Sequence, residues 1–172
     1  MRMLQKFYPK EYFPSAYQIN YAALAEKGVR GVLFDIDNTL VPHGAVVTQE
    51  AIGLFEELRS LGLKTCLISN NQEPRVRPFA EAVDSLFLCN AHKPSRKGYE
   101  HALSLMQEEP EDIVFVGDQI FTDIYGANRA GIYSILTEPI HSKEEIQIVL
   151  KRRLERLILI AYGRRKSPNR KK

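Results

Sequence analysis

Short apolar runs alternate along this chain with longer segments in which apolar residues recur every three or four positions. The first pattern is typical of buried strands and the second of amphipathic helices. The strands that the pattern predicts are 29–35, 64–69, 85–89, 113–117 and 132–136. The predicted helices are 48–61, 74–83, 97–107, 120–130 and a long last helix from 142 to about 162.

Strands that alternate with helices indicate a parallel sheet with helices on both of its faces. Because crossovers between parallel strands are right-handed, the expected fold is a doubly wound, Rossmann-like α/β domain. Residues at the helix boundaries agree with this assignment: Thr48 can cap one helix, Gly62 can end it, and Ser142-x-x-Glu145 can form a capping box. In such folds, functional residues gather at the carboxyl ends of the strands.

Two acids, Asp35 and Asp37, end the first predicted strand and are followed by Asn38 and Thr39. Their spacing can place both carboxylates on one side of an extended segment. Two carboxylates this close repel each other unless a cation or a shared proton relieves them. The alternative is an ordinary turn, because Asp, Asn and Thr are common turn residues.

A second pair of acids, Asp118 and Asp123, follows the fourth predicted strand. Asp118 could instead cap the helix that begins there. Capping does not readily explain why two separate strands each deliver acids to the same edge of the sheet. Three or four carboxylates that converge at this edge form a site of hard oxygen ligands, which suits Mg²⁺.

Residues that could hold a phosphate follow the second and third predicted strands. Ser69 and Asn70 lie at a strand-to-helix turn, where a hydroxyl and backbone N–H groups can bind phosphate oxygens. Lys93 can place a positive charge at the same edge of the sheet. For each of these segments taken alone, the alternative is a polar loop or a solvated lysine.

In their order along the chain, these residues resemble the four motifs of the haloacid dehalogenase-like (HAD) hydrolases. The motifs are Asp35-x-Asp37-x-Thr39, then Ser69, then Lys93-Pro94, and finally Gly117-Asp118 with Asp123 five residues after Asp118. The resemblance covers residues 29–136. It implies the HAD fold, with the five predicted strands in the order 3-2-1-4-5.

The resemblance also implies a reaction. Asp35 would be the nucleophile that attacks phosphorus, a task for which an ionised carboxylate needs no activating base. Asp37 would be the general acid that protonates the leaving oxygen, and later the base that activates water. An acid at this second position is a mark of the phosphatases and phosphomutases of the family, so a dehalogenase fits poorly.

The remaining motif residues are implied to bind the phosphoryl group and the metal ion. Ser69, Asn70 and Lys93 would hold the phosphoryl group, where charge develops on its oxygens. The implied ligands of Mg²⁺ are Asp35, Asp118 and the backbone carbonyl of Asp37, and Asp123 would support the metal ion directly or through water.

The intervals between the motifs leave no room for a cap domain. Only a short loop, 41–47, and one predicted helix separate Asp35 from Ser69, and one helix with a short strand separates Ser69 from Lys93. This is similar to the capless subclass III, branch IIIA, of the family. An open site of that kind suits a large substrate such as a phospholipid, a phosphoprotein or a nucleic-acid end.

Three further features narrow the resemblance to one branch of this family. Six aromatic residues lie within residues 1–21, a PheAspIleAspAsnThrLeuVal box spans 34–41, and HisLysProSerArgLysGlyTyr spans 92–99. Together they are similar to a bacterial family related to mitochondrial phosphatidylglycerophosphate phosphatase. The aromatic arm itself is expected to pack over the sheet edge; the alternative is an anchor in the lipid headgroup zone.

Composition places the chain among ordinary soluble proteins. It has 172 residues, of which 44% are hydrophobic and 26% charged, which suits one domain. No apolar run approaches the roughly 20 residues of a membrane span, and the N-terminus lacks the apolar core of a secretory signal. We therefore expect a cytoplasmic protein. Its two cysteines form no cluster of the kind that binds zinc.

Charge is distributed unevenly. Residues 151–172 contain ten basic residues and one acid, whereas the rest of the chain carries a net charge of −6. The basic end can meet an anionic membrane at its periphery, bind nucleic acid or remain solvated. We expect an aromatic arm over 1–24, a phosphatase domain over 25–162 and a basic, disordered tail over 163–172.

Two other functions compete with hydrolysis. Phosphoryl-accepting signalling modules also use Asp, Mg²⁺, a hydroxyl and Lys on a doubly wound sheet. They accept the phosphate after their third strand, however, whereas here the acids follow strands one and four. An RNA-associated protein that acts through its basic tail is the other alternative.

Overall fold

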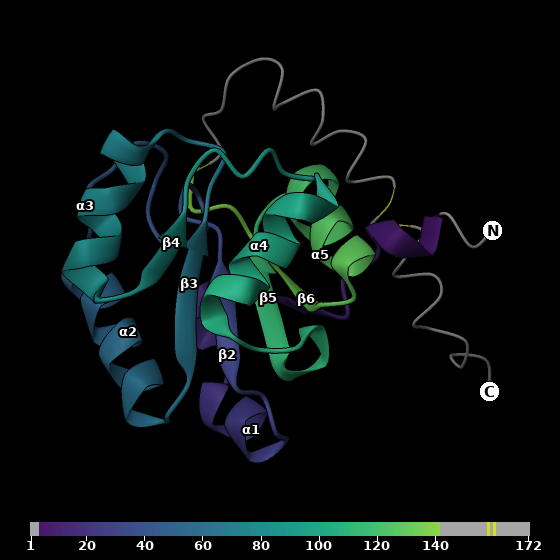
Figure 1. Cartoon of the computed structure of the whole chain (residues 1–172), viewed down its shortest axis with the longest axis horizontal. Coiled ribbons are helices and arrows are strands. Elements are labelled where there is room, and N and C mark those ends of the chain that lie inside the picture. Colours follow the sequence, from purple (N-terminus) through teal and green to yellow (C-terminus); the bar gives the residue numbers. More distant parts are fainter. Residues whose placement is uncertain (1–3, 142–157, 159, 161–172) are drawn as a thin grey trace.

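In the part of the chain that the structure describes, six parallel strands form one sheet, in the order β1-β6-β5-β2-β3-β4 (Figure 1). The structure is a computed structural model that describes residues 4–141, 158 and 160. The strands are β1 (Glu11–Phe13), β2 (Gly31–Phe34), β3 (Lys64–Ile68), β4 (Leu86–Leu88), β5 (Ile113–Gly117) and β6 (Tyr133–Thr137). The five predicted strands are β2 to β6. Their order, 3-2-1-4-5, and the parallel α/β class are confirmed.

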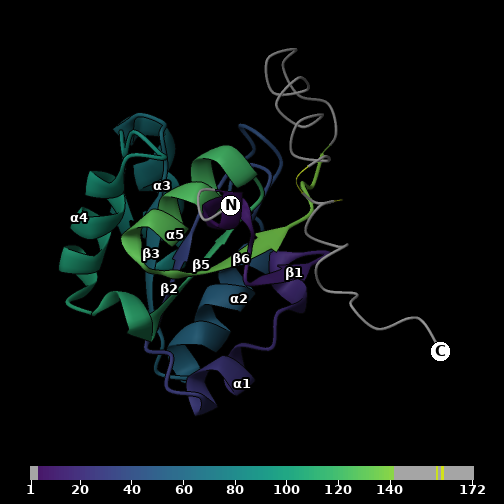
Figure 2. The same ribbon diagram turned by 90° about the vertical axis from the view of Figure 1, so that its right-hand side faces the viewer.

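Helices cover both faces of the sheet, as Figure 2 shows for α1 and α2 on one side and α4 and α5 on the other. They are α1 (Tyr21–Glu26), α2 (Gln49–Ser60), α3 (Glu73–Val83), α4 (Arg96–Met106) and α5 (Tyr125–Ala130). Side chains of β2 alternate between the two faces. Phe34 packs with α1, α2 and α3, and Leu33 packs with α4 and α5. Full burial of each such side chain stabilises the fold by about 1.5–3 kcal/mol.

Capping contacts at its two ends explain why α2 lies where the sequence predicts a helix. The hydroxyl of Thr48 accepts a hydrogen bond from the N–H of Ala51, at 3.2 Å, and α2 ends before Gly62, whose φ of 75° favours glycine. Between β2 and β3 lie only the loop 35–48, α2 and the short turn 61–63. No further domain is inserted between these two strands.

The segment predicted as one helix over 120–130 is instead a π-helical turn, η4 (Ile120–Ile124), followed by α5. Side-chain hydrogen bonds account for the difference. The carboxylate of Asp123 accepts from the N–H of Gln119, at 3.0 Å, and the hydroxyl of Tyr99 donates to the carbonyl oxygen of Thr122, at 2.9 Å. Wide turns of this kind are frequent at functional sites.

The N-terminal arm packs over the edge of the sheet, as expected, and also extends it. β1 pairs with β6, so the arm supplies the sixth strand. From the same arm, the hydroxyl of Tyr17 donates a 2.6 Å hydrogen bond to the carbonyl oxygen of Leu40. The arm therefore supports the loop that follows β2.

The long helix predicted from Ser142 to about residue 162, and the tail over 163–172, lie outside the described residues apart from positions 158 and 160. In the part of the chain that the structure describes, no helix is long and apolar enough to cross a membrane.

Candidate active site

Four strand ends meet at the carboxyl edge of the sheet. Asp35 follows β2, Ser69 follows β3, Lys93 lies in the loop after β4, and Asp118 follows β5. The sheet pairing extends one residue past two of these strands: the N–H of Asp35 donates to Val116 and that of Ser69 to the carbonyl of residue 88. The parallel sheet thus delivers Asp35, Ser69 and Lys93 to one cavity of about 150 Å³, and Asp118 lies beside it in a cluster with Asp35.

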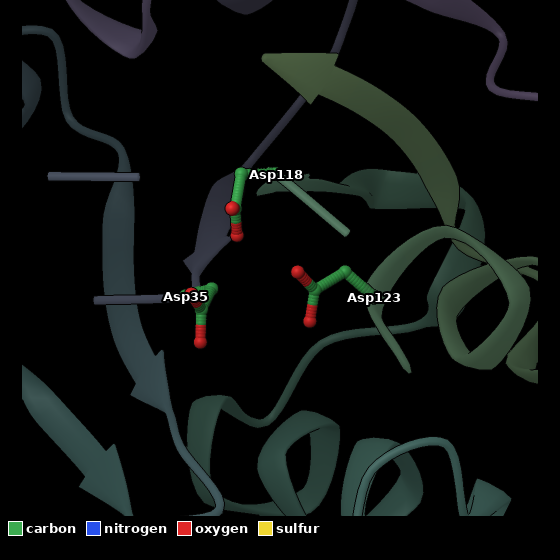
Figure 3. A group of neighbouring side chains, drawn as sticks. All are labelled: Asp35, Asp118 and Asp123. Carbon is green, nitrogen blue, oxygen red and sulfur yellow. The ribbon is translucent and has the colours of Figure 1, made fainter. Parts of the chain in front are cut away.

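Three buried carboxylates form the centre of the site. Asp35, Asp118 and Asp123 each offer an oxygen, and these oxygens lie within 4.8 Å of one another. Figure 3 shows the three side chains gathered around a common space. The hydroxyl of Thr39 lies 3.4 Å from Asp35 Oδ2 and 3.4 Å from Asp118 Oδ1. The structure therefore brings together the acids that the sequence placed at the ends of two strands.

Close packing brings Asp123 into this cluster. A Cβ atom at Gly117 would lie only 2.7 Å from Asp123 Oδ2 and 2.8 Å from Asp123 Cβ. On the other side, the buried ring of Tyr99 touches Gly126, where a Cβ would lie 2.3 Å from the ring. These two glycines leave space for η4 to approach the sheet and α4.

Lys93 bridges two of the acids. Its Nζ lies 2.5 Å from Asp35 Oδ1 and 2.8 Å from Asp123 Oδ1, and its side chain is 4% exposed. The side-chain amide of Asn70 accepts from the Lys93 N–H at 2.6 Å and donates to the Lys93 carbonyl at 3.1 Å. The side chain of Asn70, predicted to face a phosphate, thus orients the backbone of Lys93.

Burial and the neighbouring charges shift the pKa values of this pair. Burial raises the pKa of Asp35 to about 6, against the opposing effect of Lys93 and with a further increase from Asp123. For Lys93, burial alone would lower the pKa, but Asp123 and Asp35 outweigh it and raise the pKa above its usual value. The lysine is therefore cationic at neutral pH and Asp35 is mostly ionised.

Asp37 lines the same cavity, but its carboxylate contacts other partners. Asp37 Oδ1 accepts from Arg75 Nη2 at 2.8 Å and from the N–H of Gly44 at 2.9 Å, and Oδ2 accepts from Asn71 Nδ2 at 2.6 Å. The N–H of Asn71 also donates to Ser69 Oγ at 3.1 Å. The side chain of Asp37 is thus held beside α3, and it is not one of the three clustered carboxylates.

Sequence reasoning missed several residues of the site. The helical periodicity of 74–83 gave no sign that Arg75 reaches Asp37. His43, which also lines the cavity, lies in a loop with no motif. Asn71 belongs to the turn proposed to hold a phosphate, but its side-chain contact with Asp37 was not predicted.

The donor set fits a small divalent cation. Three buried carboxylate oxygens within 4.8 Å of one another are hard ligands of the kind that Mg²⁺ and similar ions prefer. Because burying carboxylates away from water is costly without positive charge nearby, a cation at this position would relieve their repulsion.

Comparison with known proteins agrees with this geometry. A family model described as haloacid dehalogenase-like hydrolase matches residues 43–131, just over half of the chain. The "Probable phosphatase YqeG" of Bacillus subtilis (strain 168) is 38% identical over 165 residues, which cover 95% of this chain and 96% of the relative.

More distant relatives include "Phosphatidylglycerophosphate phosphatase 1, chloroplastic/mitochondrial" of Arabidopsis thaliana. It is 28% identical over 158 residues, which cover 86% of this chain but only 45% of the plant protein. A HAD-superfamily hydrolase from Ehrlichia chaffeensis has a TM-score of 0.53 at 17% identity, covering 77% of this chain and 97% of the other. That likeness shows a common fold.

Proposed function

The chain belongs to the haloacid dehalogenase-like hydrolase family, and we propose that it hydrolyses phosphate monoesters through an aspartyl-phosphate on Asp35. The observation that supports this most directly is the contact between the Asp35 carboxylate and the buried Lys93 ammonium, at 2.5 Å, inside a cluster of acids. A nucleophile that is mostly ionised and lies beside a fixed positive charge is suited to attack a phosphoryl group.

Mg²⁺ is the proposed cofactor, held by Asp35, Asp118 and Asp123 together with the backbone carbonyl of Asp37. When bound, it would neutralise negative charge on the phosphoryl oxygens. This assignment draws on the three buried carboxylates, whose oxygens lie within 4.8 Å of one another.

In the first step, a carboxylate oxygen of Asp35 attacks phosphorus while the bond from phosphorus to the leaving oxygen breaks. Asp37 gives its proton to that leaving oxygen, and the alcohol departs. In the second step, Asp37 takes a proton from water, and the resulting hydroxide attacks the phosphorus of the aspartyl-phosphate. Inorganic phosphate leaves, and Asp35 and the protonated Asp37 are regenerated.

Lys93 and Ser69 are assigned to the phosphoryl oxygens. The Lys93 ammonium is already oriented by Asp35 and Asp123, so little reorganisation is needed as charge develops in the transition state. Ser69 lines the same cavity, and its hydroxyl is assigned as a donor to a phosphoryl oxygen. The side-chain amide of Asn70 holds the Lys93 backbone and is not assigned to the phosphoryl oxygens.

A phospholipid monoester such as phosphatidylglycerophosphate is the proposed substrate class. The cavity of about 150 Å³ has room for a phosphoryl group but not for a whole lipid, and no cap encloses it between β2 and β3. Two relatives, from Arabidopsis and from Chlamydomonas reinhardtii, bear the name phosphatidylglycerophosphate phosphatase. Membership in a hydrolase family also favours turnover over a stable phosphoryl acceptor.

The test compares Asp35→Asn with Asp112→Asn, a change of the same kind at the opposite edge of the sheet. With Mg²⁺ and p-nitrophenyl phosphate, Asp35→Asn should lose all turnover and Asp112→Asn should keep it. Chelation of the metal by EDTA should also abolish turnover of the unmodified protein. Retained activity in Asp35→Asn would refute the proposal.

The substrate class needs its own measurement. Phosphatidylglycerophosphate in mixed micelles should have a higher kcat/KM than glycerol 3-phosphate or a sugar phosphate. A preference for the small substrates would contradict the lipid assignment while leaving the chemistry at Asp35 intact.

A further inference from the structure

Three segments converge on the carboxylate of Asp37. Arg75 reaches it from α3, the side chain of Asn71 from the loop after β3, and the backbone N–H of Gly44 from the loop after β2, at 2.6–2.9 Å. Both carboxylate oxygens are engaged, and the Asp37 side chain is only 12% exposed. The direction in which this carboxylate points is therefore fixed by contacts and not left to free rotation.

Arg75 is the charged member of this set, and its own surroundings are unusual. Its side chain is 24% exposed, and its guanidinium lies 6.0 Å from the centre of the Phe79 ring. Its Nε is buried and has no hydrogen-bond partner among the described residues. A buried donor without a partner is unfavourable, so a purely structural role accounts poorly for the position of this guanidinium.

Arg77, two positions along the same helix, provides the contrast. It is half exposed and forms its ion pairs with Glu73 and Glu81, within its own helix. It too lies over a ring, that of Phe87, at 5.2 Å. Both arginines lie on the same helix, and each forms an ion pair and an aromatic contact of its own. Of the two, only Arg75 extends from the helix to a residue of the cavity.

We propose that Arg75 is a positioning residue, which orients the Asp37 carboxylate for proton transfer to the leaving oxygen. This inference rests on the proposed function. α3 is anchored by Val76 and Phe79 in the core, so the helix is a firm support for Arg75. The ion pair with Arg75 connects this helix to the Asp37 carboxylate, which lies on the loop after β2. Asn71 and the Gly44 N–H complete the orientation.

A role in proton transfer has a signature that a structural role lacks. General acid catalysis matters most when the leaving oxygen is strongly basic, and it contributes typically 10²–10⁴-fold. Misplacing Asp37 should therefore slow esters of basic alcohols far more than esters of acidic phenols. A general loss of structure would slow all of them by the same factor.

The experiment measures kcat/KM for a series of aryl phosphates whose phenols increase in pKa, in the unmodified protein, Arg75→Met and Arg77→Met. In Arg75→Met, kcat/KM should decline more steeply as the pKa of the phenol rises. Its loss relative to the unmodified protein should be at least about tenfold larger for the most basic phenol than for the most acidic one. Arg77→Met should run parallel to the unmodified protein. Parallel lines for all three proteins would overturn the inference.

Two further variants keep the test decisive if Arg75→Met does not fold. Arg75→Lys keeps one charged donor and should recover part of the lost activity at the basic end of the series. Asn71→Ala removes a neutral donor to the other oxygen of Asp37 and should steepen the decline in the same way as Arg75→Met. If thermal unfolding shows that Arg75→Met is not folded, parallel lines for these two variants would overturn the inference instead.

The Asp35→Asn variant separates the two proposals. Turnover retained in Asp35→Asn would defeat the proposed function, and the inference with it. An inactive Asp35→Asn together with parallel lines in the aryl series would defeat only the role of Arg75.

Discussion

Charged side chains cluster at both ends of the sheet, but in different ways. At the amino edge, Lys64 Nζ lies 2.6 Å from Glu108 Oε1, and Arg30 lies 4.0 Å from Glu108 and 3.9 Å from Asp112. Two cations face two acids. The lysine and arginine side chains are 48% and 68% exposed, whereas Asp112 is 37% and Glu108 only 8% exposed. The two cations keep contact with water and the charges balance, so this network differs from a fully buried ion pair even though Glu108 itself is buried.

At the carboxyl edge the charges are buried and unequal. Among the described residues, the cluster sets the carboxylates of Asp35, Asp118 and Asp123 against the ammonium of Lys93. Buried charges that are not fully compensated are costly, so folding alone gives little reason to place them there. The comparison teaches that charge balance and burial, rather than the number of ion pairs, distinguish a candidate active site from a structural network.

The largest effect expected from this contrast is on stability. In EDTA, Lys93→Met should lower the free energy of unfolding by about 3–5 kcal/mol, because it leaves two buried carboxylates without their partner. Lys64→Met, the same substitution at the amino edge, should cost less than Lys93→Met, because the buried Glu108 keeps Arg30 as a second partner at 4.0 Å. Urea unfolding of both variants measures the difference, and equal losses would remove the distinction between the two edges.

Much of the carboxyl edge was predictable because its chemistry follows from strand order. An apolar run that stops at an acid marks a strand end, and parallel strands end at the same edge, so Asp35, Asp118 and Lys93 could be placed together from the sequence. The end of α2 was also predictable from a single nearby residue, Gly62.

The contacts of Asp37 could not be predicted in this manner. Arg75 occupies an ordinary position on an amphipathic helix, and its partner depends on how α3 packs against the loop after β2. The pairing of β1 with β6 was also hidden, because three residues carry too short a pattern to reveal a strand. The basic tail, with its competing lipid and RNA partners, stays a prediction.

Alanine substitutions of two glycines at opposite ends of the sheet should have a smaller effect on stability, but they should differ in their effect on activity. Gly117→Ala brings a Cβ to 2.7 Å from Asp123 Oδ2, and Gly31→Ala brings one to 2.5 Å from Met106 Cε and 2.8 Å from the Lys64 carbonyl. Each change should cost about 1–3 kcal/mol of stability through overpacking.

Only the change at the carboxyl edge should also affect the chemistry. Gly117→Ala displaces Asp123 and should lower kcat/KM for an aryl phosphate in the folded protein, whereas Gly31→Ala should leave it near the unmodified value. If the two alanine variants lose activity equally, once corrected for the folded fraction, the glycine at the end of β5 has no special part in the site.

The most direct test of the account is a calorimetric titration with Mg²⁺. The central claim is that the unequal, buried charges of the carboxyl edge form a divalent-cation site and the balanced charges of the amino edge do not. The unmodified protein and Glu108→Gln should bind Mg²⁺ with the same affinity, and Asp118→Asn should bind it at least about tenfold more weakly, a loss of about 1.4 kcal/mol. Equal binding by Asp118→Asn, or no binding by the unmodified protein, would contradict the claim.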